Sequence, residues 1–339
     1  MVAQRILPGL YRIEVPLPGN PLKATNSYVF TSRKRNLIVD TGLNRPECLQ
    51  TMRSSLSKLG VELNQTDFFI THMHADHVGL VPAIALGRSQ IYCSRPEAEF
   101  INDFGLSSQQ WDFIMKFARV NGYPDSELEE PIKTNQGVKG IPGQTINFTI
   151  VGEGDVIKVG DYRLVCIETP GHSQGHLCLY ETNKKLLFSG DHILDKITPT
   201  VSQWSLNGNH LREYLTSLNK VQALDVSLTL PGHRNLITDC RRRISELKTH
   251  HQFRLQEILS LLTARQGQTA YHIASRMNWN LSYTEWEQFP RIQRFFATGE
   301  ALSHLVYLVK NGKVRAEEVN GITFFYPAAK EIDLQGNDS

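Results

Sequence analysis

Three histidines and one aspartate occupy six consecutive positions in the stretch THMHADH, as His72, His74, Asp76 and His77. A single zinc ion takes about four donors, and a catalytic zinc leaves one position open for water. Four side chains so close in sequence cannot easily all turn toward one ion, so the stretch predicts either unused donors or two metal ions. The β-like run DFFIT comes directly before it, which places the cluster at the end of a strand.

Three further donors follow β-like runs later in the chain. They are His172 in ETPGHSQGH, Asp191 in LLFSGDH and His233 in LTLPGHR. Each lies beside Gly or Pro, where a strand fixes the position and a tight turn frees the side chain. Taken singly, each also fits a purely structural role, such as a hydrogen-bonded turn histidine or, for Asp191, a helix N-cap. Together with the first cluster they supply the donors of a binuclear site.

The order of these motifs resembles the metallo-β-lactamase superfamily, whose mark is HxHxDH followed by single His, Asp and His donors. The resemblance covers roughly residues 5–240 and implies an α/β fold, an αββα sandwich with the site at one edge. It also implies three donors for each of two metals and one donor for both. The first metal would be held by His72, His74 and His172, the second by Asp76, His77 and His233, and Asp191 would bridge them.

The expected chemistry follows from the charge of the two ions. Two divalent ions roughly 3.5–4 Å apart share one water and lower its pKa from 15.7 toward about 7, and the resulting hydroxide attacks a carbonyl or phosphorus. We therefore expect Asp76 and Asp191 to act in catalysis as well as in metal binding. Imidazole and carboxylate donors suit two zinc ions, with iron or manganese as alternatives.

Three other residues near these motifs have expected supporting roles. Asp40, which closes LIVDTG, matches a recurrent family position and is expected to orient a ligand or a loop without binding metal. His176 is expected to close the turn into the next strand. His192 either packs beside Asp191 or contacts substrate.

The periodicity of the chain agrees with two sheets covered by helices. The first forty residues alternate β-like runs with turns and predict an antiparallel opening, and helices are expected over 46–60 and 78–87. We predict a catalytic domain over 1–240 that contains a helical insertion at about 96–136.

The pattern becomes mainly helical from about residue 241. Three helices and a hairpin at Asn320-Gly321 predict a winged-helix-like domain over 241–330, followed by a flexible tail over 331–339. Residues 268–327 carry six Lys or Arg against five Asp or Glu. We therefore favour a packing or oligomerisation role over nucleic-acid binding, and a homodimer is one such arrangement.

The overall charge gives no sign of a polyanionic partner. Lys and Arg number 36 against 34 Asp and Glu, a net charge of +2, which predicts neither a nucleic-acid footprint nor a membrane patch. The local run Arg241-Arg242-Arg243 is expected to be the solvated start of a helix, although it could contact an RNA backbone.

No apolar run approaches the roughly 20 residues of a membrane span, and MVAQRILPGL lacks a signal core, so a cytoplasmic protein is expected.

Two segments are candidates for the substrate walls. An apolar stripe within 96–136 either packs its helix on the fold or covers the metals with an aromatic wall suited to an acyl group. Its residues are Trp111, Phe113, Ile114, Phe117, Ala118 and Val120. The segment ILDKITPTVSQW is expected to form another wall, with Lys196, Thr198 and Ser202 as candidates for polar contacts.

Among the activities of the superfamily, the sequence favours a dinuclear metal-dependent hydrolase whose bridging hydroxide attacks a small ester or thioester. The expected partner is therefore a small-molecule acyl substrate. An endoribonuclease or phosphodiesterase is the alternative. An iron-dependent sulfur dioxygenase is less favoured, because it would use only the first three-donor site and leave Asp76, His77 and His233 without a role.

Overall fold

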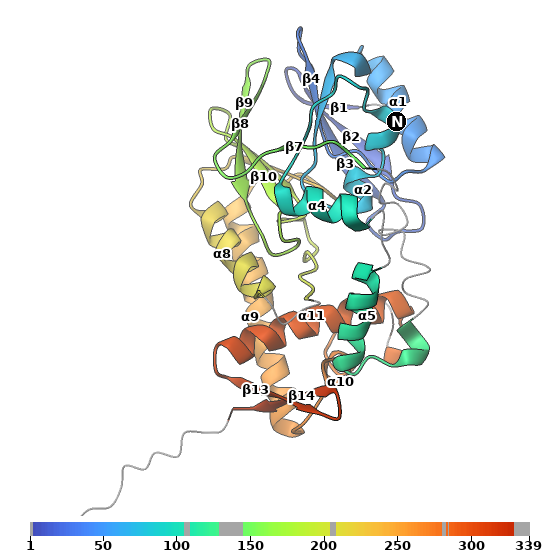
Figure 1. Ribbon diagram of the computed structural model, residues 1–339. Helices are drawn as coiled ribbons and strands as arrows, with labels where there is room; N and C mark the ends of the chain where they lie inside the picture. The colour runs from blue at the N-terminus through green and yellow to red at the C-terminus, as the bar shows by residue number, and fades with distance from the viewer. Residues whose placement is uncertain are drawn as a thin grey trace, which may run out of the picture. The chain divides into compact units, whose positions relative to one another are not determined.

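A computed structural model describes residues 3–104, 109–128, 145–203, 208–279, 283 and 285–328 (Figure 1). The chain divides into two compact units. The first comprises residues 1–113, 132–201 and 210–249, and the second comprises 114–131, 202–209 and 250–339. This division falls inside one continuous helix, whereas the domain boundary expected at 240 stays a prediction. Among the described residues, no helix combines the length and the apolar character that crossing a membrane requires.

The first unit contains a seven-stranded sheet in which the strands follow one another in sequence order. Its strands are β1 (Gln4–Leu7), β2 (Leu10–Pro16), β3 (Ala24–Phe30), β4 (Asn36–Val39), β5 (Thr66–Phe69), β6 (Ile91–Cys93) and β7 (Thr149–Ile150). Strands β1 to β4 are antiparallel, which confirms the expected opening, and β4 to β7 are parallel. All residues of β4 and β5 are buried, as parallel strands with both faces covered require.

A second sheet of five strands has the order β12-β11-β10-β9-β8. Its strands are β8 (Val156–Val159), β9 (Tyr162–Glu168), β10 (Leu177–Glu181), β11 (Leu186–Gly190) and β12 (Leu228–Pro231). Strands β8 to β11 are antiparallel neighbours, while β12 runs parallel to β11. Consequently β9, β11 and β12 all point the same way and end at one edge of the sheet.

The two sheets face each other across one hydrophobic core. Tyr28 and Phe30 of β3 and Phe188 of β11 form its aromatic centre, with ring centroids 5.2 Å apart for each of the two pairs with Phe188. Apolar residues of both sheets, among them Leu37 and Leu164, complete it. Burial of these side chains stabilises the sandwich by roughly 1.5–3 kcal/mol for each large apolar residue.

Helices flank the paired sheets, as the expected αββα sandwich requires (Figure 1). In the first unit they are α1 (Pro46–Lys58), η1 (Leu63–Gln65), α2 (Ala75–Val78), α3 (Val81–Ile84), α4 (Arg95–Phe104), α8 (His210–Gln222) and the start of α9 (Cys240–Ala264). Helix α1 confirms the helix expected over 46–60. The single helix expected over 78–87 is wrong: the amide of Leu80 bonds to the carbonyl of Gly42, which interrupts the helical ladder. The short α3 then begins at Val81, with Pro82 in its first turn.

The second unit combines most of α5 (Gln109–Val120) and α9 with later elements. These are α10 (Ala270–Ala274), η2 (Trp286–Gln288), α11 (Arg291–Lys310), β13 (Val314–Val319) and β14 (Ile322–Pro327). Strands β13 and β14 form the expected hairpin, since Val319 pairs with Ile322 and both Asn320 and Gly321 have positive φ. The helices and the hairpin are those expected, while the winged-helix assignment stays a prediction.

The apolar stripe of α5 takes part in packing within the second unit. Phe117 packs against the hydrophobic core of this unit, and Ala118 is fully buried. Phe113 is exposed, and the side chain of Trp111 lies outside the described residues. The packing interpretation therefore accounts for Phe117 and Ala118, and the aromatic wall stays a prediction.

Candidate metal centre

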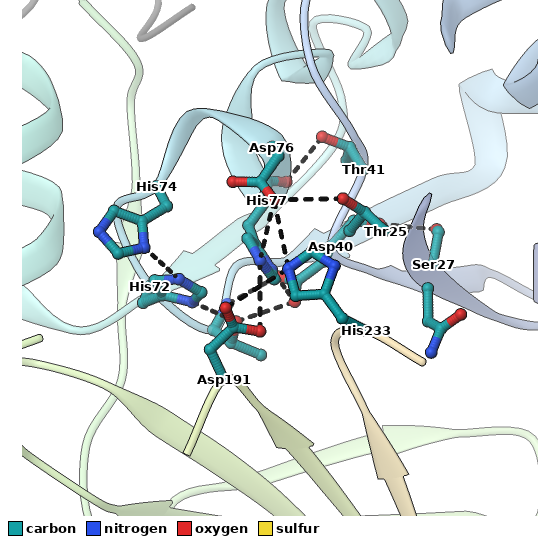
Figure 2. Close-up of polar contacts among 12 residues, drawn as sticks. Thr25, Ser27, Asp40, Thr41, His72, His74, Asp76, His77, Asp191 and His233 are labelled. Atoms are coloured by element: carbon teal, nitrogen blue, oxygen red, sulfur yellow. Dashed lines mark hydrogen bonds and ion pairs between the residues drawn. The ribbon is translucent and has the colours of Figure 1, made fainter. Parts of the chain in front are cut away.

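The sheet topology brings the predicted donors together. His72 and His74 lie in the loop after β5, and Asp76 and His77 lie on the short α2 that follows it. His172, Asp191 and His233 follow β9, β11 and β12, the three strands that end at the same edge of the second sheet. Four loops from two sheets thus converge at one place. Figure 2 shows His72, His74, Asp76, His77, Asp191 and His233 close together.

A first group of donors consists of His72, His74, His172 and Asp191, each of which offers one atom within 4.8 Å of the others. Nε2 of His72 lies 2.9 Å from Nδ1 of His74, and Nε2 of His172 lies 3.1 Å from the same atom. Nε2 of His172 lies 3.8 Å from Oδ2 of Asp191. Three ring nitrogens and one carboxylate oxygen therefore lie close enough together to share one metal ion.

A second group consists of Asp76, His77 and His233. Nε2 of His233 lies 3.3 Å from Oδ2 of Asp76, and Nε2 of His77 lies 3.7 Å from it. The same two nitrogens lie 3.4 Å and 3.6 Å from the two carboxylate oxygens of Asp191. Asp191 therefore lies at both groups, as a bridging carboxylate would (Figure 2).

Three of the donor histidines are held directly by their outer ring nitrogen. Nδ1 of His77 bonds to Asp40 at 2.7 Å, Nδ1 of His172 to the Thr200 carbonyl at 2.7 Å, and Nδ1 of His233 to the Ala24 carbonyl at 2.8 Å. These acceptors require a proton on Nδ1, so Nε2 presents a lone pair to the centre when the ring is neutral.

His72 is oriented through a relay. The Thr71 hydroxyl donates to Asp40 at 2.8 Å and lies 3.0 Å from Nδ1 of His72. Because the hydroxyl proton is committed to the carboxylate, the hydroxyl oxygen accepts from Nδ1 of His72. Asp40 thus orients two donor histidines without belonging to either donor group, which is the role expected for it.

Several inward atoms have no partner in the protein. Within the described residues, Nε2 of His77, Nε2 of His233 and Oδ1 of Asp191 are buried and make no hydrogen bond. Buried polar atoms are normally satisfied, and a divalent cation would satisfy all three at once. The residues present therefore fit a metal centre.

The first group is electrically suited to a cation. Burial lowers the pKa of His72 well below its usual value and lowers the pKa of His74 to about 3, and neighbouring histidines add to both effects. Burial also lowers the pKa of His172, although Asp191 acts against it. These imidazoles are therefore neutral near pH 7, which is the form that binds metals.

The second group behaves in the opposite way. Burial opposes the charge of His77, yet Asp40, Asp76 and Asp191 raise its pKa to about 9, and Asp191 and Asp76 raise the pKa of His233. In turn the histidines lower the pKa of Asp76 and Asp191 despite their burial. Metal binding here has to displace protons from His77 and His233, so it should release protons to the solvent.

Residues of β3 hold the loop of His233, and the sequence did not reveal them. The side-chain amide of Asn26 donates to the carbonyls of Pro231 at 2.9 Å and Arg234 at 3.0 Å, and the Tyr28 hydroxyl donates to Pro231 at 2.8 Å. These bonds join the two sheets. The only sequence signal for them is a polar Asn directly before the β-like run SYVFTS, which carries Tyr28.

The two flanking histidines are structural. Nδ1 of His176 lies 2.8 Å from the Thr169 hydroxyl, and its Nε2 accepts a hydrogen bond from the amide of Asp191 at 3.2 Å. His176 therefore holds the backbone of Asp191 in place. His192 is fully buried with its ring 5.2 Å from that of Tyr214. His192 therefore packs inside the fold and belongs to neither donor group, while a contact with substrate stays a prediction.

The segment after Asp191 reaches the site through its backbone. The Thr200 carbonyl accepts from His172, whereas Lys196, Thr198 and Ser202 belong to neither donor group. Arg243 donates to the carbonyls of Leu194 at 2.8 Å and Ile197 at 2.7 Å. The third residue of the basic run thus supports this segment.

Curated proteins similar to this chain include thioesterases. The chain is 26% identical over 246 residues to an atrochrysone carboxyl ACP thioesterase of Aspergillus novofumigatus, covering 72% of this chain and 60% of that protein. It is 25% identical over 257 residues to a beta-lactamase-like protein 2 homolog of Caenorhabditis elegans, covering 76% and 71%. The chain thus spans about 60% of the length of the fungal thioesterase.

Solved structures match almost the whole chain. A metallo-beta-lactamase family protein from Thermus thermophilus is 28% identical with a TM-score of 0.79, over 95% of this chain and all (100%) of the other. A beta-lactamase domain protein from Burkholderia ambifaria is 24% identical with a TM-score of 0.77, over 96% and 95%, which shows a shared fold. The family model described as the metallo-beta-lactamase superfamily matches residues 20–233, more than half of the chain, so the protein belongs to the metallo-beta-lactamase superfamily.

Proposed function

We propose that the protein is a dinuclear metal-dependent hydrolase of small acyl thioesters or esters. The observation that carries this proposal is the position of Asp191, whose carboxylate lies within 3.8 Å of donor nitrogens in both groups. The similarity to an acyl carrier protein thioesterase supports a thioester as the bond that is cleaved. Because the chain spans only part of that relative, the activity is proposed here and not transferred.

The proposed roles of the residues follow from their contacts. His72, His74 and His172 would hold the first ion, Asp76, His77 and His233 the second, and Asp191 both. Two such ions, when bound, lower the pKa of a shared water and polarise the carbonyl under attack. Asp76 and Asp191 would hold the ions and orient that water from their places in the two groups, while Asp40 accepts a hydrogen bond from Nδ1 of His77, so that Nε2 faces inward.

Zinc is the proposed metal, since five imidazoles and two carboxylates form a donor set that zinc prefers. Iron or manganese could also bind to imidazole and carboxylate donors, but this donor set favours zinc. A sulfur dioxygenase would need only the first group. The close arrangement of Asp76, His77 and His233 supports two ions and therefore argues for the hydrolase.

A ribonuclease is the weaker alternative. Of the three consecutive arginines, Arg243 has only 14% of its side chain exposed and is bound to backbone carbonyls and to Glu246. Arg242 also pairs with Glu246. These contacts with backbone carbonyls and Glu246 leave less positive charge for a phosphate backbone than the sequence suggested.

A cytoplasmic location and a homodimer stay predictions.

The test is a substrate panel with defined variants. The zinc-loaded protein is assayed with short- to long-chain acyl thioesters, in which the released thiol is measured, with p-nitrophenyl esters, and with single-stranded RNA at low salt. We expect thioester or ester cleavage that a chelator abolishes and zinc restores. Cleavage of RNA with silence toward the whole acyl panel would overturn the proposal.

Asp191→Ala examines the two-metal assignment in the same assay. This change should abolish turnover and lower the bound metal while the fold is retained, because it removes an oxygen donor from both groups. Asp225→Ala is the matched control, since this exposed aspartate pairs with Lys185 at the surface and should leave turnover unchanged. Full turnover and unchanged metal content in Asp191→Ala would exclude the bridging role.

A further inference from the structure

A buried glutamate beside the metal centre has no role in the chemistry described so far. Glu97 lies in the first turn of α4 and is 1% exposed. Its Oε2 accepts from the amide of Met73 at 2.6 Å, and its Oε1 accepts from the amide of Gly175 at 2.6 Å. Both carboxylate oxygens are therefore occupied by backbone donors from two different loops.

The two loops are those that carry the first donor group. Met73 stands between His72 and His74 in the loop after β5 of the seven-stranded sheet. Gly175 belongs to the loop between β9 and β10 of the five-stranded sheet, which contains His172 and ends at His176. One side chain thus ties together segments that come from opposite sheets and that must present nitrogens about 3 Å apart.

The local packing is built around this carboxylate. A Cβ added at Gly175 would lie 2.3 Å from Oγ of Ser94 and 3.0 Å from Cγ of Glu97. A side chain at position 175 would therefore require Ser94 or the start of α4 to shift, so glycine favours the close approach by which the amide reaches Glu97. The small size of Gly175 and the carboxylate of Glu97 together make this contact possible.

The cost of burying the acid indicates that the contact serves a purpose. A buried carboxylate is unfavourable unless its oxygens are hydrogen-bonded. Burial raises the pKa of Glu97, while the side chain of Ser173 and the amides of Gly175 and Met73 favour its charged form. An uncharged acceptor could hold one loop at lower cost, but two amides that approach from different loops require two oxygens on one planar group.

We infer that Glu97 is a positioning residue that sets the spacing between the His72–His74 loop and the His172 loop, and thereby the affinity of the first metal. Glu97 is not a ligand, because it lies outside both donor groups and both of its oxygens are already used. The inference rests on the proposed function insofar as this group holds a metal. It also predicts selectivity: Asp76, His77 and His233 are held by other contacts and should keep their metal.

Glu97→Gln provides the most specific change. The amide of glutamine retains one oxygen, but its NH2 group then faces the N–H of either Met73 or Gly175, so one loop loses its anchor. Changes in groups that orient metal ligands typically lower metal affinity by roughly 10–100-fold. Glu99→Gln is the matched control on the same helix, since the Glu99 side chain is 66% exposed and pairs loosely with Arg95.

The experiment measures the two zinc dissociation constants of the purified protein by competition with a chromophoric chelator. His74→Ala identifies which binding step belongs to the first group. We expect Glu97→Gln to weaken that step about tenfold or more, to leave the other step within about twofold, and to alter the visible absorption of the cobalt-substituted protein. Glu99→Gln should match the wild type in every measurement.

The outcomes separate the two proposals. If the wild type binds zinc at two sites and Glu97→Gln binds both ions with wild-type affinity, Glu97 has no positioning role while the proposed function stands. A lower melting temperature of the metal-free variant with unchanged zinc affinities would likewise assign Glu97 a purely structural role. If the wild type binds no metal, the proposed function and this inference both fall.

Discussion

The carboxylate of Asp40 accepts a hydrogen bond from Nδ1 of His77 at 2.7 Å. Asp40 also accepts from the amide and the hydroxyl of Thr71, at 2.9 Å and 2.8 Å. Its backbone has φ +56°, a left-handed conformation that costs a non-glycine residue of order 1–3 kcal/mol. The three hydrogen bonds offset this strain. The strained turn after β4 therefore orients His77 directly and His72 through Thr71.

Asp40→Asn should weaken metal binding while the backbone is preserved. Asparagine tolerates the left-handed conformation, so the change isolates the carboxylate. Its single side-chain oxygen cannot serve all three donors, and we expect zinc affinity to fall by roughly 10–100-fold, measured by chelator competition. Asp67→Asn is the control, because Asp67 also bonds to an amide and to Arg35 but lies in neither donor group. Equal zinc affinities in the two variants would contradict this account.

Gly171→Ala should disturb the loop that carries His172. Gly171 has φ +141°, and a Cβ there would lie 2.4 Å from Cβ and 2.5 Å from Cα of Tyr214. Relieving such a backbone contact requires movement of α8 or of the loop, so we expect the unfolding free energy to fall by about 1–3 kcal/mol, the usual cost of overpacking. Gly87→Ala is the control, since nothing lies within 4 Å of its added Cβ and its φ is not positive. Chemical denaturation of both variants is the measurement, and equal midpoints would refute the steric argument.

The donors of the site could be predicted from sequence because each one follows a strand. His172, Asp191 and His233 stand beside Gly or Pro at the end of a β-like run, and strands that share a direction deliver their ends to one edge. The order of the motifs also predicted how these residues divide between two ions, and the same residues lie together in the two groups, while their roles as metal ligands stay predictions. Local patterns of this kind predict the folded structure well, since strand ends and turns are determined by neighbouring residues.

The residues that hold the loops could not be predicted in this way. Asn26 reaches Pro231 and Glu97 reaches Gly175, contacts between residues far apart in sequence that no periodicity encodes. The helix expected over 78–87 is wrong for the same reason, because the amide of Leu80 bonds to Gly42 and not to its own helix. Tertiary hydrogen bonds here override local propensity.

Removal of metal should destabilise the first unit. Without a cation, inward atoms of His77, His233 and Asp191 lack hydrogen-bond partners among the described residues. Zinc at 100 times its dissociation constant stabilises a protein by about 2.7 kcal/mol. For a unit of this size that corresponds to a rise of roughly 5–10 °C in melting temperature. Calorimetry with and without chelator tests this, and an unchanged melting temperature would contradict it.

Glu300 should make the stability of the second unit depend on pH. Burial raises the pKa of Glu300 to about 7, although Arg254 acts against it. Since the unfolded glutamate titrates near 4.5, this group stabilises the fold below that pH, and the contribution is lost as the pH rises toward 7. His304 has the opposite pH dependence, because burial lowers its pKa from 6.5 to about 3. Above pH 6.5 this histidine is neutral in both the folded and the unfolded chain, and it costs no stability through its charge. As the pH falls from 6.5 toward 3 the unfolded chain binds the proton first, so the folded state loses stability.

Glu300→Gln removes the first of these effects and leaves the second. The difference in unfolding free energy between variant and wild type should therefore favour the variant more at pH 8 than at pH 4.5, because at pH 8 only the wild type carries a negative charge at this half-buried position. Denaturant unfolding at the two pH values measures this difference. Glu318→Gln, at an exposed position on β13, should give the same small difference at both. A Glu300→Gln difference that does not change with pH would mean that the carboxyl group has the same pKa in the folded and unfolded chains, so that Arg254 cancels the effect of burial.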